Sequence, residues 1–301
     1  MIDGALLLDK PLGLSSNAAL QKARKLLGAA KAGHAGTLDP LASGLLMVLL
    51  GEATKFAGPM LDADKEYVAT LKLGERTSTG DAEGEILQKR PVDTASLDIV
   101  LERFKGEIEQ VPPMHSALKH KGTPLYRLAR RGEEVERAPR RVRITDLELL
   151  KRDGERLVLR VRCSKGTYIR VLAQDIGEAL GCGAHLSGLR RTASGRFHIE
   201  QAATLEELEE MDAQSRRGLL LPLTSLLEGL PRAELGPHEE TRLRQGQTLK
   251  ISGLQHGVCA VLRPDGEVIG LASADAAGLK PLRLTQTAEK HLKSATHIKT
   301  E

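Results

Sequence analysis

The chain has 301 residues, which is enough for one large domain or two ordinary domains with a buried core. Three isolated cysteines without C-x-x-C spacing argue against a disulfide framework and a zinc site, and no apolar run approaches the ~20 residues of a membrane span. The formal net charge is only +4, but residues 115–143 hold nine Lys or Arg against three Glu, a local charge of +6. Such a basic block is typical of a polyanion-binding surface, although a solvated basic loop has the same composition.

The N-terminal residues predict a strand followed by a helix. Residues 4–9 are a short apolar run that we interpret as a buried strand, and no basic segment precedes it. We therefore expect no secretory signal peptide and a cytoplasmic location. Ser15 or Ser16 can cap a helix that continues to Leu27 and stops at Gly28.

Residues 33–46 hold one carboxylate, Asp39, in a loop framed by glycines. Pro40 biases Asp39 toward an extended backbone, and the glycines allow close approaches that a β-carbon would block. The apolar run near residues 43–50 should be a buried helix or strand, which places Asp39 at the edge of a core. That location suits a reactive carboxylate, although an Asp-Pro turn that caps the next helix has the same pattern.

The middle of the chain predicts strands that alternate with helices. Residues 67–73 and 157–163 alternate in polarity with the two-residue period of a strand. Residues 74–85 are expected to be a loop, and the apolar spacing over residues 94–105 predicts a helix. The second strand should be followed by a turn and a helix that ends at Gly181.

The basic segment 115–143 predicts a short helix of its own. Thr123 and Pro124 have the character of an N-cap and a first turn, and Gly132 predicts the end of the helix. We expect this helix to display three arginines to a polyanion: Arg127, Arg130 and Arg131.

The C-terminal third predicts a second, smaller domain. Residues 204–217 are expected to be a charged helix, and Pro222 and Pro231 bracket a predicted linker. Strand-like pieces with Gly and Pro-Asp-Gly turns over residues 232–284 predict a small β domain. Residues 285–301 are polar and are expected to form a disordered tail.

Several familiar catalytic motifs are absent from the sequence. No P-loop, G-x-G-x-x-G, G-x-S-x-G or H-E-x-x-H occurs, so kinases, dinucleotide enzymes, serine hydrolases and metalloproteases lose their usual support. A hydrolase that uses His34 and Asp39 lacks a recognisable nucleophile partner.

A series of short motifs follows one another over residues 4–195. They are LDKP (8–11), HAGTLDPLASG (34–44), LGEATK (50–55), DKEY (64–67), CSKGTYIR (163–170), GCGAHL (181–186) and LRR (189–191). In sequence and order they resemble the motifs of the bacterial TruB family of tRNA pseudouridine synthases. The match in the last third of the chain is loose.

The resemblance implies an α+β fold and a division into domains. The pseudouridine synthase fold has a mixed, largely antiparallel sheet flanked by helices around a central cleft. It would occupy residues 1–229, with residues 115–143 as a thumb-like insertion that grips RNA. A small PUA-like RNA-binding β domain would occupy residues 230–284.

The resemblance also implies an activity: isomerisation of the uridine at position 55 in the T arm of tRNA to pseudouridine. No cofactor, metal or guide RNA is implied, and the implied partner is the T stem-loop. We expect a monomer that needs neither a protein partner nor a membrane. Two alternatives stay open: a guide-RNA-dependent pseudouridine synthase, and an RNA-binding or RNA-folding protein without turnover. RNA-guided relatives tend to lack a comparable insertion, which favours a stand-alone enzyme.

By the same resemblance, Asp39 is the nucleophile, Arg170 is its cationic partner and Tyr67 is the third catalytic residue. A guanidinium stays charged and can hold a carboxylate bidentately. The Tyr67 ring can lie on a flipped uracil while its hydroxyl handles a proton. Without the resemblance, Arg170 would be interpreted as part of a surface ion pair, and Tyr67 as a tyrosine of the hydrophobic core. Whether Asp39 attacks the sugar, attacks the base or assists glycal formation stays open.

The resemblance assigns further residues to RNA binding. His34 is expected to contact RNA where the base leaves its stack, and Tyr168 and Leu189 are expected to line the base pocket. Lys10 matches a lysine near the family's site.

Overall fold

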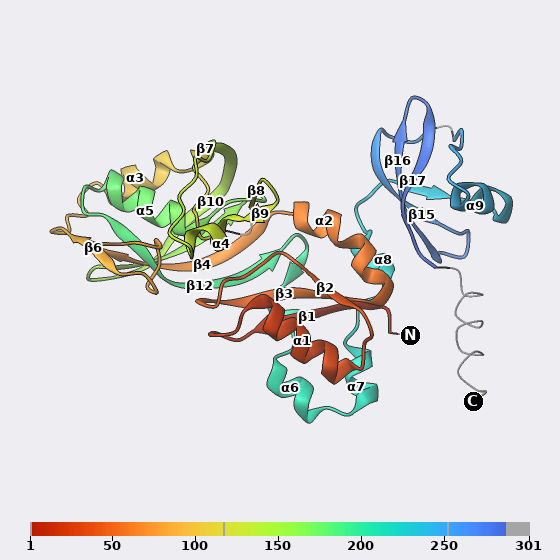
Figure 1. Cartoon of the computed structure of the whole chain (residues 1–301), viewed down its shortest axis with the longest axis horizontal. Coiled ribbons are helices and arrows are strands. Elements are labelled where there is room, and N and C mark those ends of the chain that lie inside the picture. Colours follow the sequence, from red (N-terminus) through yellow and green to blue (C-terminus); the bar gives the residue numbers. More distant parts are fainter. Residues whose placement is uncertain (1, 117, 252, 287–301) are drawn as a thin grey trace.

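The computed structural model describes residues 2–116, 118–251 and 253–286, and within them it has a large and a small β-sheet (Figure 1). The large sheet has nine strands and the small sheet has four. The small sheet lies beside one end of the large one and is joined to it through a short helix, α8 (Figure 1).

The large sheet has the strand order β1-β3-β12-β4-β11-β10-β7, with β2 paired to β3 and β13 paired to β12. Its strands are β1 Gly4–Lys10, β2 Ala32–Ala35, β3 Ala42–Leu50, β4 Lys65–Leu73, β7 Gly106–Gln110, β10 Arg140–Asp153, β11 Arg156–Cys163, β12 Ala184–Ser194 and β13 Phe197–His198. In this sheet β3 and β12 run parallel and the other paired strands run antiparallel. The sheet is therefore mixed and largely antiparallel, as the resemblance implied.

Helices flank the large sheet at both ends. Their bounds are α1 Ser16–Leu27, α2 Ala57–Asp62, α3 Leu97–Arg103, α4 Leu125–Ala129, α5 Ile169–Ala179, α6 Leu205–Glu210, α7 Ala213–Gly218 and α8 Leu223–Leu226, with 3₁₀ helices η1 Gly51–Phe56 and η2 Ile199–Gln201. Helix α1 packs on β2 and β3 with α6 and α7 beside it, whereas α5 packs on β12 and β4 and α3 on α5 and β10 (Figure 1). Two small strand pairs lie outside the sheets: β5 Glu75–Thr77 with β6 Ile86–Lys89, and β8 Lys119–His120 with β9 Thr123–Pro124.

Strand β3 is covered on both faces. One face packs with α1 through Leu46, Val48 and Leu50. The other face packs into a second cluster through Leu45 and Met47. A strand buried on both faces is a continuous apolar run without alternation, which is why the sequence left helix and strand open at residues 43–50.

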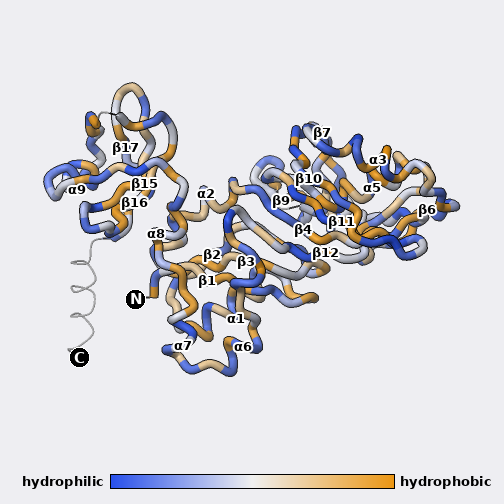
Figure 2. Tube along the Cα trace, turned by 180° about the vertical axis from the view of Figure 1, so that it is seen from behind, coloured by the Kyte–Doolittle hydropathy of each residue, from blue (hydrophilic) through white to orange (hydrophobic). Residues whose placement is uncertain are grey.

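The C-terminal β domain is confirmed as a four-stranded sheet. Its elements are β14 Arg232–Glu234, α9 Pro237–Arg244, β15 Gly257–Leu262, β16 Val268–Asp275 and β17 Gly278–Leu284. Hydrophobic residues concentrate along β15 and β16 (Figure 2). Leu262 and Leu271 of this sheet share one buried cluster with Met47, Phe56 and Leu226 of the larger part. The two parts are therefore joined by a common apolar core.

Helix α4 differs from the predicted helix of the basic segment. Thr123 and Pro124 form strand β9, which pairs with β8 across the residues Lys121 and Gly122 at positive φ. Pro124 occupies the N-cap position, and the helix ends at Ala129. The Thr-Pro pair ends a tight hairpin here, and the helix starts only after it.

Three other local predictions were wrong in detail. Residues 74–85 contain strand β5, and the helix predicted over residues 204–217 is two helices, because Asp212 breaks the first and caps the second. The predicted linker at residues 222–231 contains helix α8, whose Leu226 is fully buried.

The C-terminal tail was predicted to begin at residue 285. Thr285 is buried, and Gln286 is exposed but its main-chain N–H donates to Glu52 at 2.7 Å, so the protein fixes the backbone of both residues. The rest of that predicted tail, residues 287–301, lies outside the described residues.

Candidate active site

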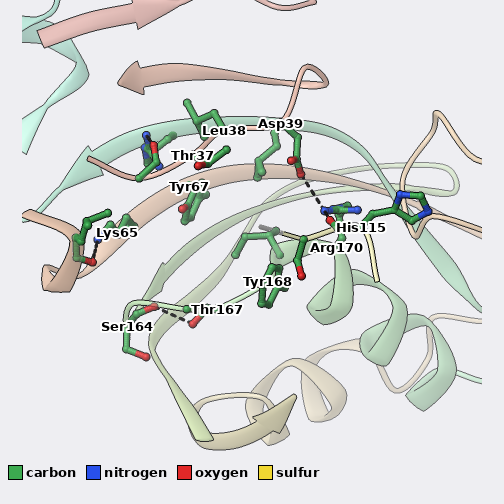
Figure 3. Close-up of a pocket in the computed structure, with 17 residues that line it drawn as sticks. Thr37, Leu38, Asp39, Lys65, Tyr67, His115, Ser164, Thr167, Tyr168 and Arg170 are labelled. Carbon is green, nitrogen blue, oxygen red and sulfur yellow. Dashed lines mark hydrogen bonds and ion pairs between the residues drawn. The ribbon is translucent and has the colours of Figure 1, made fainter. Parts of the chain in front are cut away.

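A cavity of about 270 Å³ opens where the Asp39 loop, strands β4 and β12 and the start of α5 meet (Figure 3). Five residues that the sequence singled out line it: Asp39, Tyr67, Tyr168, Arg170 and Leu189. They come from four separate segments of the chain. The fold therefore brings the three predicted catalytic residues to one place.

Asp39 and Arg170 form an ion pair at the cavity wall, drawn as a dashed line in Figure 3. The distance from Arg170 Nη2 to Asp39 Oδ2 is 3.0 Å, and the arginine and aspartate side chains are 8% and 48% exposed, respectively. The carboxylate is thus open to a ligand, while the cation that faces it is buried. A charge that is fixed before the reaction begins needs no reorganisation during it.

Arg170 makes further contacts, besides the one with Asp39, that the sequence did not suggest. Its Nη2 donates to the carbonyl of His115 at 2.6 Å, and its Nη1 lies 3.4 Å from a second carboxylate, Asp81. Asp81 is 5% exposed, and its carboxylate accepts hydrogen bonds from Thr79 Oγ1 and the N–H of Glu83. Its only sequence signal was its place in an acidic loop, which did not point to the site.

The loop that carries Asp39 is clamped by the start of α1. Ser16 Oγ donates to the carbonyl of Leu38 at 2.8 Å and accepts from the N–H of Leu38 at 2.7 Å. The N–H of Gly13 donates to the carbonyl of Pro40 at 2.8 Å. Ser15 is the N-cap of α1, so Ser16 is free to bind the loop. The loop itself is shorter than predicted, because His34 lies in strand β2.

Tyr67 stands on β4, between β11 and β12. Burial raises the pKa of its hydroxyl, and the nearby Arg191 guanidinium opposes that rise. The side chain is therefore a neutral phenol near pH 7, and it lines the same cavity as Asp39.

Tyr168 and Leu189 complete the apolar side of the cavity. Tyr168 is the N-cap residue of α5, and its main-chain N–H and carbonyl are both bound by the amide of Gln110, at 3.0 and 3.3 Å. Burial also raises the pKa of the Tyr168 hydroxyl. Leu189 lies on β12, opposite Ala69 of β4. These contacts fix both residues by main-chain geometry.

Lys10 and His34 lie near this cavity but do not line it. Lys10 is fully buried, and its Nζ donates to the carbonyls of Pro11 and Leu14 at 2.9 and 2.6 Å. Burial lowers the pKa of Lys10 to about 8, with the Asp39 carboxylate acting in the opposite direction. Lys10 therefore orders the chain that leads to α1.

His34 lines an adjoining cavity of about 390 Å³ that also includes Asp39, Arg130 and Arg170. Its Nδ1 is buried without a hydrogen-bond partner among the described residues, and burial lowers the pKa of the ring. This adjoining cavity shares Asp39 and Arg170 with the first cavity and reaches the basic segment at Arg130.

The three arginines of the basic segment are exposed, as predicted. Arg130 lies over the ring of Tyr126, 5.7 Å from its centre, and lines the adjoining cavity. Arg127 and Arg131 line neither cavity, and Arg131 lies 3.9 Å from Glu133.

The described residues contain no group of three or more His, Cys, Asp or Glu side chains that could hold a metal ion. The three cysteines are free and buried, and burial raises the pKa of Cys163 to about 12, which disfavours a thiolate. No described helix is both long and apolar enough to cross a membrane.

Comparison with known proteins identifies the family of this chain. The family model "TruB family pseudouridylate synthase (N terminal domain)" matches residues 24–169, and "tRNA pseudouridylate synthase B C-terminal domain" matches residues 170–228. A tRNA pseudouridine synthase B of Thiobacillus denitrificans is 54% identical over 290 residues, which cover 96% of this chain and 97% of the relative. A protein of the same name from Azoarcus sp. is 53% identical over 95% of this chain and 96% of its own.

Solved structures agree on the fold. A chain in the crystal structure of a Cbf5-Nop10-Gar1 complex superposes with a TM-score of 0.71 and 30% identity, covering 94% of this chain and 84% of that one. A chain in the archaeal box H/ACA sRNP Nop10-Cbf5 complex gives a TM-score of 0.69 at 28% identity, covering 94% and 85%. From the family models and the near full-length relatives, this chain belongs to the TruB family of pseudouridylate synthases.

Proposed function

We propose that this protein isomerises uridine to pseudouridine in tRNA, at position 55 of the T arm, with Asp39 as the nucleophile. The observation that carries the proposal is the Asp39–Arg170 ion pair at the wall of a cavity that also holds Tyr67. The names of the relatives support tRNA as the substrate. The cavity is smaller than the roughly 300–1,000 Å³ of drug-sized ligand sites, which suits a single base.

The chemistry needs no oxidant and no added group. The bond from N1 of uracil to C1′ of the ribose breaks, and a bond from C5 to C1′ forms. C5 loses one proton and N1 gains one, so the base keeps its composition. The chemistry needs a carboxylate next to the reacting nucleoside, whether it acts on the sugar, on the base or through a glycal, and Asp39 supplies it beside a fixed cation.

Each neighbouring residue has a role in this scheme. Arg170 pairs with Asp39 and orients it, and Tyr67 stacks on the uracil and moves a proton. Tyr168 and Leu189 enclose the base, which must leave its stack to enter the cavity. His34 lines the adjoining cavity, where it would contact RNA. Lys10 orders the segment that leads to α1, which lies next to the Asp39 loop.

We further propose that residues 1–229 are the catalytic unit, that its insertion 115–143 binds the T stem-loop, and that residues 230–284 are a PUA-like RNA-binding domain. The three arginines that the insertion was expected to display are exposed, and one of them, Arg130, lines the adjoining cavity. This supports the assignment of RNA binding to the insertion. The protein acts in the cytoplasm as a monomer, without a guide RNA, a cofactor or a protein partner.

The test uses the purified protein and an unmodified tRNA transcript, without guide RNA or cofactor. Pseudouridine is mapped along the transcript, and Asp39→Asn serves as the matched control. We expect pseudouridine at position 55 with the parent and none with the control. Pseudouridine that appears only when guide RNA is added would replace this proposal by the guide-dependent alternative. Tight binding without product would leave an RNA-binding protein.

A further inference from the structure

Arg191 is the largest fully buried side chain among the described residues, and the scheme above gives it no role. It is 1% exposed and lies on β12, in register with Gly44 of β3 on one side and Tyr67 of β4 on the other. It lines the same cavity as Asp39 and Tyr67. Arg191 therefore lies between strand β3, which follows the Asp39 loop, and strand β4, which carries Tyr67.

The guanidinium binds both ends of the Asp39 loop. Its Nε donates to the carbonyl of Leu45 at 2.7 Å, and its Nη2 donates to the carbonyl of Gly36 at 3.1 Å. These acceptors come just before and just after the segment that holds Asp39. In the described part of the chain, the hydrogen-bond acceptors of Arg191 are thus main-chain carbonyls, and its charge is not neutralised by them.

Two glycines of the loop lie directly against Arg191, one against its side chain and one against its main chain. Gly36 has φ +91°, and a β-carbon there would lie 3.2 Å from Arg191 Nη1. Gly44 has φ +101°, and a β-carbon there would lie 2.3 Å from the carbonyl oxygen of Arg191. The positive φ and the close approach together disfavour a side chain at both positions. The loop is therefore packed against the Arg191 side chain at Gly36 and against the main chain of β12 at Gly44.

Charged groups on several elements surround the Arg191 guanidinium. The titratable groups are Lys10 on β1, His34 on β2 and Lys65 on β4, and the pKa of each is lowered, mainly by burial and in part by Arg191. Burial is the largest influence on the pKa of Tyr67 and raises it; Arg191 acts in the opposite direction, toward ionisation, whereas Cys163 and Asp39 act with burial. A buried cation without a carboxylate partner favours a negative charge on the group next to it.

We propose that Arg191 is a positioning residue for proton transfer: it fixes the Asp39 loop and, as the cross-strand neighbour of Tyr67, presents its cation on the same face of the sheet, so that the phenol oxygen can lose a proton and accept one from C5 of the base. The proposal rests on the proposed function. The proton count balances: ionisation of Tyr67 releases one proton to solvent, C5 transfers its proton to the phenolate, and N1 takes one from solvent.

The test separates this role from loop support. Each protein is prepared with ordinary tyrosine and with 3-fluorotyrosine, whose phenol is more acidic. The chain has only three tyrosines and no tryptophan, so the label reaches few sites. The variants are Arg191→Met, which removes the cation, and Arg191→Lys, which keeps a charge but not the two-carbonyl geometry. Arg190→Met is the matched control, because Arg190 is the adjacent residue and pairs with Asp9.

We expect Arg191→Met to lower the single-turnover rate by ~10² or more, the scale of a positioned acid or base. Arg191→Lys should lose less, and Arg190→Met should lose less than ~5-fold, as for a partly exposed ion pair. Fluorotyrosine should raise the single-turnover rate of Arg191→Met by at least ~10-fold. It should not raise the rate of Tyr67→Phe, and this second result excludes effects from the other tyrosines.

A spectroscopic measurement does not depend on turnover. The ionisation of fluorotyrosine at position 67, obtained from absorbance after subtraction of the Tyr67→Phe spectrum, should occur at higher pH in Arg191→Met than in the parent. An unchanged ionisation, or no fluorotyrosine rescue in a folded Arg191→Met protein, overturns the proposal and leaves Arg191 as loop support. A parent that binds tRNA but makes no pseudouridine overturns the proposed function instead, and the absorbance result still decides the role of Arg191.

Discussion

The cavity and the basic segment 115–143 both present positive charge, but they hold it in opposite ways. In the cavity, Arg170 is 8% exposed and lies between Asp39 and Asp81, with a main-chain carbonyl behind it. In the basic segment, Arg131 is 65% exposed, and its one ion pair in the described residues spans 3.9 Å to Glu133. Buried charges interact strongly in fixed geometry, whereas exposed charges are weakened by salt and side-chain entropy. We therefore expect the cavity to set the rate and the segment to set affinity.

Removing the charge of Asp39 should have the largest effect on the rate. Asp39→Asn keeps the shape of the side chain, so turnover should fall below detection while tRNA affinity changes by less than ~10-fold. Single-turnover pseudouridine formation and filter binding measure the two effects. Asp98→Asn, the same change on the exposed face of α3, is the control. Product formation by Asp39→Asn at the parental rate contradicts the mechanism.

Arg170→Lys should have the next largest effect, a loss of ~10²–10³ in turnover. A single ammonium cannot contact Asp39, Asp81 and the carbonyl of His115 in the geometry that the planar guanidinium adopts. Circular dichroism checks the fold, because Arg170 is buried. If lysine supports the parental rate, charge alone is sufficient and the fixed geometry is unimportant.

Tyr67→Phe should lower turnover by ~10² and leave tRNA binding unchanged. Phenylalanine keeps the ring that would stack on uracil and loses only the hydroxyl. Tyr126→Phe, in the basic segment, is the matched control, and comparison of the two variants tests the contrast between the cavity and the segment directly. A near-parental rate for Tyr67→Phe in a single-turnover assay would reduce Tyr67 to a stacking surface.

Much of the site could be predicted because its residues lie in short, distinctive motifs. Asp39, Tyr67 and Arg170 each stand in such a motif, and the cavity brings all three together. Strand β4 and helix α1 were predicted from periodicity and capping, because each buries one face more deeply than the other. The two-face burial of β3 removed that signal.

Long-range contacts account for what the sequence missed. Asp81 contributes to the site only because Arg170, far along the chain, folds against it. Arg191 was visible as part of a motif, but its contacts with Gly36 and Leu45 depend on the parallel pairing of β3 and β12. The core shared by the two sheets likewise left no local pattern, so residues 222–231 were interpreted as a linker.

The smallest expected effect on the rate comes from the exposed arginines of the basic segment. Changing Arg127, Arg130 and Arg131 together to Gln should weaken tRNA binding and reduce the slope of log affinity against log salt by up to ~3, about one for each phosphate that the variant no longer neutralises. The rate at saturating tRNA should stay near the parental value, because the ion pairs of Asp39 and Arg170 in the described structure involve none of the three. The matched control changes three exposed cations at the far end of the β10–β11 hairpin: Lys151, Arg152 and Arg156. Binding measured across a salt series should separate the two triple variants. An equal slope in both would show that the basic segment is a solvated loop, and affinity would then have to come from the cavity and the small domain.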